Sequence, residues 1–158
     1  MKIPRALRAG VLAAALPLPA AAEIALDTVQ VCVARQAAAQ TSPTSCVDEA
    51  MADCVNITAD AAALASQCFR AARAGWSAGI TARMDALRAD APERIAAIAG
   101  VEVKYDLIAG LTQCDRMEEL ALLGDRALDQ VQREADGCAA AAAGIAYVRL
   151  LWRARDLR

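Results

Sequence analysis

The chain has 158 residues, of which 58% are hydrophobic, 23% charged and 3% aromatic, and its formal net charge is −2. It contains no histidine, which excludes a Ser-His-Asp or Cys-His catalytic pair, a histidine-ligated zinc or haem iron, and an imidazole pH switch. The near-neutral charge without a basic stripe argues against nucleic acid as the main partner.

Alanine dominates the composition, with 42 residues, and alanine is the strongest helix former but a poor core filler. The composition therefore predicts an all-α fold, a small disulfide-stapled helical bundle of about four or five helices. Five aromatic residues are available to anchor its core: Phe69, Trp76, Tyr105, Tyr147 and Trp152.

The first 22 residues have the parts of a secretory signal peptide. Three basic residues precede a short apolar stretch, and a run of three alanines ends at Ala22. The alternative is a membrane anchor, but a spanning helix needs about 20 apolar residues and two prolines interrupt this stretch. We predict cleavage before Glu23, which leaves one domain over residues 23–158 with no transmembrane segment. Losing three basic and no acidic residues brings its charge to −5, and its location is predicted to be periplasmic or secreted.

All six cysteines lie in the predicted mature part, and an even count in an exported chain indicates a disulfide framework. They are Cys32, Cys46, Cys54, Cys68, Cys114 and Cys138. No two are spaced as CxxC, which excludes a thioredoxin-type motif, a c-type haem attachment site and the usual zinc-knuckle spacing. We therefore expect no metal and no cofactor.

Turn residues predict a first helix over 23–40 and a second over 46–55. If consecutive helices form antiparallel hairpins, cysteines equidistant from a turn face each other. This predicts the pairs Cys32–Cys54 and Cys46–Cys68 and leaves Cys114–Cys138 as the third. The pairing Cys32–Cys46 with Cys54–Cys68 remains the alternative.

The third predicted helix, over 59–88, has the clearest amphipathic stripe, with a mean step of about 3.6 residues. Phe69 and Trp76 belong to it and are interpreted as core anchors. The stripe consists of Phe69, Ala72, Trp76, Ile80, Met84 and Leu87.

A sequence resembling a capping box, Asp90 to Glu93 with Pro92 in the first turn, predicts the start of a fourth helix. Its apolar positions are Ile95, Ile98, Val101, Tyr105 and Ile108. Because residues 101–105 also alternate between apolar and polar, a short strand there is the alternative.

The last helix follows Gly124, and its alanine run over 139–143 is interpreted as a close-packing surface. Its expected buried face carries Ala127, Val131, Cys138, Ala142, Ile145 and Trp152. The chain ends in a basic cluster that either stabilises the helix C-terminus or contacts an acidic partner or anionic lipid headgroups. The candidate contact residues are Arg149, Trp152, Arg153 and Arg155.

Carboxylates are the only other groups that could take part in catalysis or metal binding. The candidates for acid-base catalysis are Glu118, Glu119, Asp125 and Asp129. The candidates for binding calcium are Asp48, Glu49 and Asp53. The first set is spaced as on a solvated helix face, and the second lacks a calcium loop of alternating oxygen ligands. The sequence thus contains no catalytic constellation, and we expect a protein that is not an enzyme.

The spacing of Cys46, Cys54 and Cys68, with Phe69 and Trp76 following, resembles the LprI-like domain of bacterial periplasmic proteins, some of which inhibit lysozyme. The resemblance covers residues 46–87, with weaker agreement from residue 113 to 150. It implies a small exported helical domain with disulfides and a peptidoglycan-related binding role. No inhibitory residues carry over, because Ala72, Ser77 and Thr81 stand where the family commonly has Glu, Asp and Asn.

These observations predict an exported periplasmic binding or inhibitor protein, with a protein partner for which the resemblance suggests lysozyme. The alternatives are a carboxylate-dependent envelope hydrolase and a purely structural envelope protein. The oligomeric state is not indicated by the sequence.

Overall fold

The computed structural model describes residues 24–155, and the predicted signal peptide lies outside the described residues. Within that range the fold is all-α, with no strand, so the strand alternative over 101–105 is wrong. The elements are α1 (Leu26–Ala38), α2 (Ser45–Ala50), α3 (Ala52–Val55), the short 3₁₀ helix η1 (Ala59–Ala61), α4 (Ala62–Asp90), α5 (Glu93–Leu122) and α6 (Leu128–Arg153).

The helix count exceeds the expected four or five because the segment predicted as one helix over 46–55 is broken. Met51 has φ −99° and ψ 4°, which lies outside the helical region and separates α2 from α3. The disulfide-stapled bundle is otherwise confirmed, with three disulfides among six α-helices in the described part of the chain.

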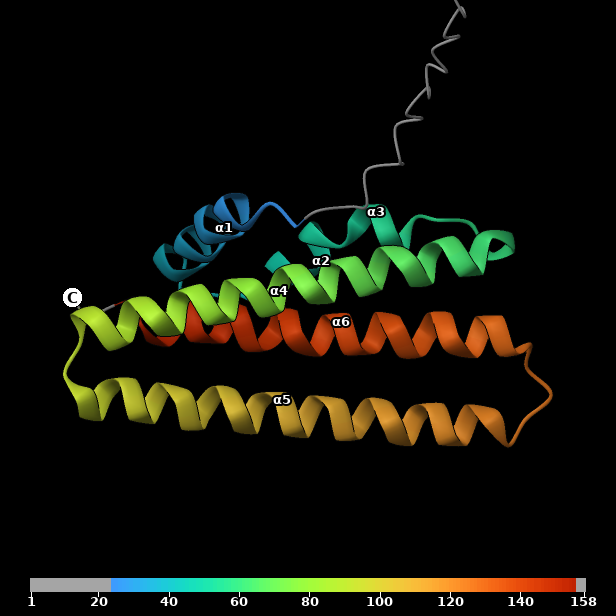
Figure 1. Cartoon of the computed structure of the whole chain (residues 1–158). Coiled ribbons are helices and arrows are strands. Elements are labelled where there is room, and N and C mark those ends of the chain that lie inside the picture. The colour runs from blue at the N-terminus through green and yellow to red at the C-terminus, as the bar shows by residue number, and fades with distance from the viewer. Residues whose placement is uncertain (1–23, 156–158) are drawn as a thin grey trace, which may run out of the picture.

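Helix α6 lies between α4 and α5, as Figure 1 shows, and α1 and α2 also pack on it. It runs parallel to α4 and antiparallel to α5. Its central part is buried on nearly all sides, which requires small side chains: Ala140, Ala143 and Ala146 have almost no exposed surface. The expected close-packing surface over 139–143 is therefore confirmed, although the buried region is wider than the single face predicted.

The amphipathic stripe of α4 is confirmed, because all six of its residues are buried. Trp76 is fully buried and its ring centroid lies 5.7 Å from that of Tyr147 on α6. Phe69 is also buried, with its ring edge 3.3 Å from the position that a Cβ atom on Gly137 would take. These aromatic residues anchor the contact between α4 and α6.

The predicted orientation of α5 is wrong. The face that meets α6 is made of small residues, Ala96, Ala99 and Val103, with Gly110 so close to Ala142 that a Cβ atom there would lie 2.8 Å from the Ala142 Cβ. The larger apolar residues are largely exposed: Val101, Tyr105 and Ile108 lie outside the contact with α6, and Ile98, 48% exposed, lines a groove beside Leu150 and Ala154. Tyr105 is therefore not a core anchor.

The capping box predicted at the start of α5 is also wrong. Asp90 is the last residue of α4, and α5 begins at Glu93 with Pro92 as its N-cap and no side-chain cap hydrogen bond. The residue before a proline is disfavoured in the helical region, and Ala91 is extended with φ −104° and ψ 158°. The chain therefore turns at Ala91, and the N-cap of α5 is Pro92 instead of Asp90, which the capping box requires.

The structure pairs Cys32 with Cys46, Cys54 with Cys68, and Cys114 with Cys138, and it leaves no described cysteine free. The third pair confirms the prediction, whereas Cys32–Cys54 and Cys46–Cys68 are wrong. The break at Met51 separates Cys46 from Cys54, so the expected hairpin does not form: a disulfide joins the middle of α1 to α2, and another joins α3 to α4.

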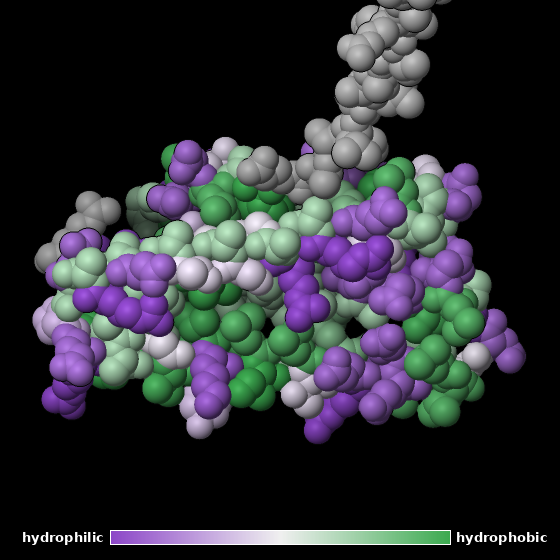
Figure 2. Space-filling view, in the orientation of Figure 1, coloured by the Kyte–Doolittle hydropathy of each residue, from purple (hydrophilic) through white to green (hydrophobic). Residues whose placement is uncertain are grey.

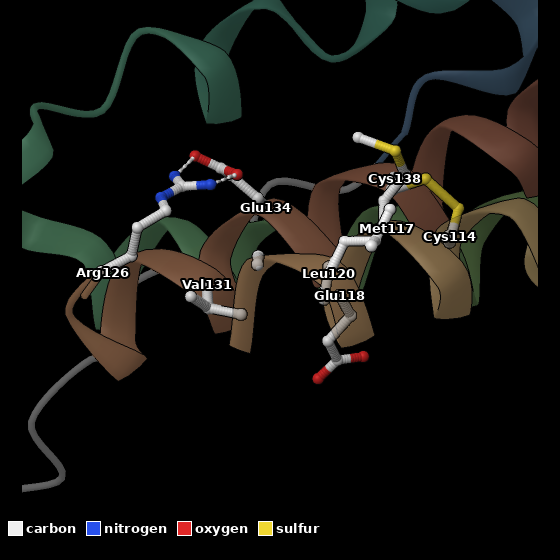
Figure 3. Close-up of a pocket in the computed structure, with 10 residues that line it drawn as sticks. Cys114, Met117, Glu118, Leu120, Arg126, Val131, Glu134 and Cys138 are labelled. Atoms are coloured by element: carbon white, nitrogen blue, oxygen red, sulfur yellow. Dashed lines mark hydrogen bonds and ion pairs between the residues drawn. A yellow bond between two sulfur atoms is a disulfide. The ribbon is translucent and has the colours of Figure 1, made fainter. Parts of the chain in front are cut away.

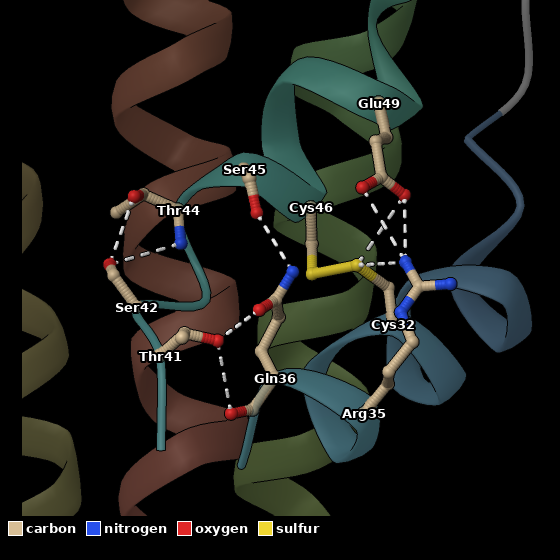
Figure 4. The surroundings of a disulfide bond; sticks show 9 residues. All are labelled: Cys32, Arg35, Gln36, Thr41, Ser42, Thr44, Ser45, Cys46 and Glu49. Atoms are coloured by element: carbon tan, nitrogen blue, oxygen red, sulfur yellow. Dashed lines mark hydrogen bonds and ion pairs between the residues drawn. A yellow bond between two sulfur atoms is a disulfide. The ribbon is translucent and has the colours of Figure 1, made fainter. Parts of the chain in front are cut away.

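Polar contacts reinforce the first staple, as Figure 4 shows. The Arg35 guanidinium forms an ion pair with Glu49 at 3.2 Å and lies 3.6 Å from the Cys32 Sγ. On the other side, Gln36 Nε2 donates to Ser45 Oγ at 3.1 Å. The C-terminal end of α1 is thereby fixed to the start of α2.

Across residues 24–155, no helix combines the length and the apolar character that crossing a lipid bilayer requires.

Candidate binding surfaces

Two arginines of the C-terminal basic cluster form ion pairs with residues of α5. Arg149 Nη1 lies 2.8 Å from Asp106 Oδ1, and Arg153 Nη1 lies 3.0 Å from Asp106 Oδ2 and 3.5 Å from a Glu102 oxygen. These ion pairs tie the end of α6 to the middle of α5. The contact of these arginines with a partner stays a prediction.

The other two members of the cluster, Trp152 and Arg155, contact each other. The Arg155 guanidinium lies over the half-buried Trp152 ring, 4.5 Å from its centroid, and Arg155 Nη1 donates to the Trp152 carbonyl at 2.8 Å. The Trp152 carbonyl therefore accepts a hydrogen bond at the C-terminal end of α6, while its side chain packs at the edge of the core.

A second surface lies at the opposite end of the bundle, where α5 turns into α6. We call residues 115–129 the hairpin tip. Its large apolar side chains are exposed, with 85% of Leu123 and 73% of Leu128 accessible to solvent; the others are Met117, Leu120 and Leu122. Figure 2 shows hydrophobic residues gathered beside hydrophilic ones at this end of the molecule. Large exposed apolar residues grouped in this way are typical of interaction sites.

The hairpin tip is also acidic. Five of its seven charged residues are carboxylates: Asp115, Glu118, Glu119, Asp125 and Asp129. The two cations are Arg116 and Arg126. Arg126 forms a bidentate ion pair with Glu134 of α6. The surface therefore combines aliphatic side chains with an excess of negative charge.

A groove of about 350 Å³ runs between α5 and α6 beside this surface. Figure 3 shows the Arg126–Glu134 pair at one end of the groove and the Cys114–Cys138 disulfide at the other. Met117, Leu120 and Val131 line it between these ends, and Glu118 lies at its rim. The disulfide fixes the two walls relative to each other, so the groove is preformed.

The hydrogen bond from Arg126 holds the pKa of Glu134 below its usual range, against the opposing effect of desolvation. The pKa of Asp60 is also lowered, first by the side-chain hydrogen bond of Thr58 and then by a backbone hydrogen bond. A general acid needs the opposite shift, toward neutral pH. These two carboxylates are therefore tuned for ion pairing and hydrogen bonding.

Of the candidate catalytic carboxylates, Glu118 lies at the rim of the groove. Glu119, Asp125 and Asp129 are exposed, and Glu118 is half-buried. In the calcium candidate, Glu49 is instead the ion-pair partner of Arg35. Among residues 24–155, no group of three histidine, cysteine, aspartate or glutamate residues is arranged to hold a metal ion.

Comparison of the chain with protein-family models, with curated proteins and with solved structures found no match. The candidate surfaces therefore rest on the structure itself.

Sequence reasoning missed the exposed apolar residues of α5 and the hairpin tip. It treated large apolar positions as core and did not consider a helix that packs through alanine and glycine. A second stripe of small residues, Ala96, Ala99, Val103 and Gly110, could have revealed the true orientation of α5, since it also follows helical spacing.

Proposed function

We propose that the chain is an exported binding protein that holds a basic protein partner at its hairpin tip. The observation that carries this proposal is the combination of exposed leucines and an excess of carboxylates over cations on a hairpin that a disulfide holds in place. A rigid surface loses less conformational entropy on binding, and this favours affinity.

Export is supported by the disulfides. Three bridges use all six cysteines, and such frameworks form and persist in oxidising compartments. The leader-like sequence of the first 22 residues points to the same route, and its basic start and length are typical of secretion into the periplasm.

The chemistry of the partner follows from the charge of the surface. An acidic patch attracts a basic protein over a distance of about 10 Å at moderate salt and raises the association rate. The exposed leucines then provide the apolar area that is buried, and so removed from solvent, when the partner binds. Lysozyme, the partner that the resemblance to LprI-like proteins suggests, is the natural first candidate.

Binding of lysozyme to the oxidised, secreted protein tests the proposal by biosensor measurement and by lysis of a peptidoglycan suspension. Replacing Leu123 and Leu128 together with serine should weaken binding at least tenfold. The matched control is Val31→Ser on α1, also an exposed aliphatic residue but on a different surface, and it should bind as the wild type does.

The electrostatic contribution to binding can be tested separately from the apolar one. Glu119→Lys with Asp125→Lys should slow association and reduce its dependence on salt, with a smaller effect on dissociation. Absence of binding to lysozyme and to other basic periplasmic proteins would contradict the proposal. A lytic activity of the chain itself, abolished by Glu118→Gln, would favour the alternative of a carboxylate-dependent hydrolase.

A further inference from the structure

The N-terminal half of α5 carries an apolar stripe that no other element covers. We call Ile98, Val101, Tyr105 and Ile108 the outer stripe; between 48% and 67% of each residue is exposed. Val101, Tyr105 and Ile108 lie on the side of α5 away from Ala96, Ala99 and Val103, whereas Ile98 lies at the edge of the stripe and lines a groove beside Leu150 of α6. In Figure 1, α5 forms one edge of the three-helix layer, and Figure 2 shows hydrophobic residues along the same edge.

The spacing of the outer stripe is that of a coiled-coil seam. Its steps are 3, 4 and 3 residues, which are the a and d positions of a heptad repeat. Such a seam is narrower than the face that packs into a globular core, and it is suited to one partner helix. The occupant that the stripe fits is therefore a helix with the same spacing.

We propose that this occupant is α5 of a second copy of the chain, lying antiparallel across a twofold axis at Val103. The steps read the same in both directions from that residue, so Ile98 meets Ile108 of the second copy and Val101 meets Tyr105 of the second copy. A twofold interface requires this reciprocity, in which residue i contacts j and j contacts i.

The sizes of the residues favour the antiparallel arrangement. It places each large Tyr105 against the smaller Val101, whereas a parallel pair would place two tyrosines against each other. Layers that alternate large and small side chains interdigitate better than layers of equal size. The dipoles of two antiparallel helices point in opposite directions, which also favours the antiparallel arrangement.

The available area sets the strength of the contact. At their exposed fractions the four side chains offer roughly 450 Å² of surface, against about 800 Å² per partner in a stable interface. Flanking residues such as Ala97 and Ala109 are small and let the helices approach. The dimer is thus expected to be reversible, with a dissociation constant of about micromolar order.

Sedimentation velocity of the oxidised, secreted protein tests this interface across a concentration series. The wild type should pass from monomer to dimer, and Val101→Glu should remain monomeric. Val31→Glu makes the same change at an exposed position of α1 and should dimerise normally. A wild type that stays monomeric to about 100 μM, or a Val101→Glu protein that still dimerises, overturns the proposal.

Register is tested by exchanging the apolar contact for an ionic one. Val101→Lys alone and Tyr105→Glu alone should each abolish dimerisation, whereas the double variant should restore it at low salt, because each lysine then faces a glutamate of the second copy. A parallel pair would place like charges together, so failure of the double variant while wild type dimerises overturns the antiparallel register. Circular dichroism of each variant verifies that the fold is retained.

This inference is independent of the hairpin tip. A dimer that binds no basic protein would refute the proposed function alone, and a monomer that binds lysozyme would refute the dimer alone.

Discussion

Gly144 of α6 lies against the indole ring of Trp76 on α4, and a Cβ atom at this glycine would come within 3.0 Å of Trp76 Cε2 and 2.7 Å of Val47 Cγ1. Three elements, α2, α4 and α6, meet at this point with no space for a methyl group. The contact shows how tightly the centre of the bundle is packed.

Gly144→Ala should therefore destabilise the protein, by about 1–3 kcal/mol, because rigid neighbours must shift to accept the methyl group. Urea denaturation followed by circular dichroism measures the loss. Gly100→Ala in α5 is the control: its Cβ atom would lie 3.6 Å from Met84 Cε, an ordinary contact, and alanine's better helix propensity should add up to about 1 kcal/mol. Equal effects at the two sites would refute the packing argument.

Peptide mapping without reduction should find Cys32 linked to Cys46 and Cys54 linked to Cys68. The two pairs have the same sequence separation of 14 residues, and each joins neighbouring elements. Alkylation of the denatured, unreduced protein should label none of the six cysteines. Recovery of a Cys32–Cys54 peptide, or of two or more labelled thiols, would contradict the structure.

Replacing both Cys114 and Cys138 with serine should lower the stability strongly. The bridge closes a loop with a sequence separation of 24 residues, and constraining the unfolded chain by such a loop contributes about 3 kcal/mol. The expected drop in melting temperature is about 10 °C.

As the control for this variant, Glu118→Gln with Glu119→Gln should leave the melting temperature nearly unchanged, since these side chains are at most half-buried and helical surface charges contribute little. Calorimetry of both variants makes the comparison. A larger loss in the glutamine variant would mean that the carboxylates, and not the bridge, hold the hairpin.

The Arg126–Glu134 pair should make a small, pH-dependent contribution to stability. Arg126 lowers the folded-state pKa of Glu134, so the contribution is present above the unfolded pKa and is lost as the pH falls through the lower folded pKa. An NMR titration should show Glu134 releasing its proton at a higher pH in Arg126→Gln than in the wild type. An unchanged Glu134 titration would show that the pair does not form in solution.

Export and cleavage are tested by intact-mass measurement of protein recovered from the periplasm. The chain should begin at or near Glu23, because the three alanines before it provide the small side chains that signal peptidase requires. Recovery of the full-length chain from the cytoplasm would contradict both the predicted compartment and the argument for disulfides.

The sequence predicted most of the fold because α4 has an unambiguous pattern. Phe69, Trp76 and Leu87 repeat at helical spacing with polar residues between them, and all three are buried. The pair Cys114–Cys138 followed as the remainder of the cysteine set. In α4 a local property of the chain, its helical periodicity, coincides with its tertiary role.

The errors have a common physical origin in small residues. In α5 the larger apolar residues gave the stronger signal, yet close approach to α6 is made by Ala96, Ala99 and Gly110, which bury little area individually. The first two disulfides were mispaired because the break at Met51 has no strong local signal, such as proline or glycine. Both outcomes depend on which neighbour a helix meets, and periodicity does not contain that information.

The central place of α6 has a consequence for the order in which the molecule can assemble. Synthesis proceeds from the N-terminus, so α6 is made after α1, α4 and α5, which all pack on it. Without residues 128–153, α4 and α5 have little to pack against, and Trp76 has lost its neighbour Tyr147. We expect the growing chain to remain loosely structured until α6 emerges, so that tertiary folding of residues 24–155 waits for residues 128–153.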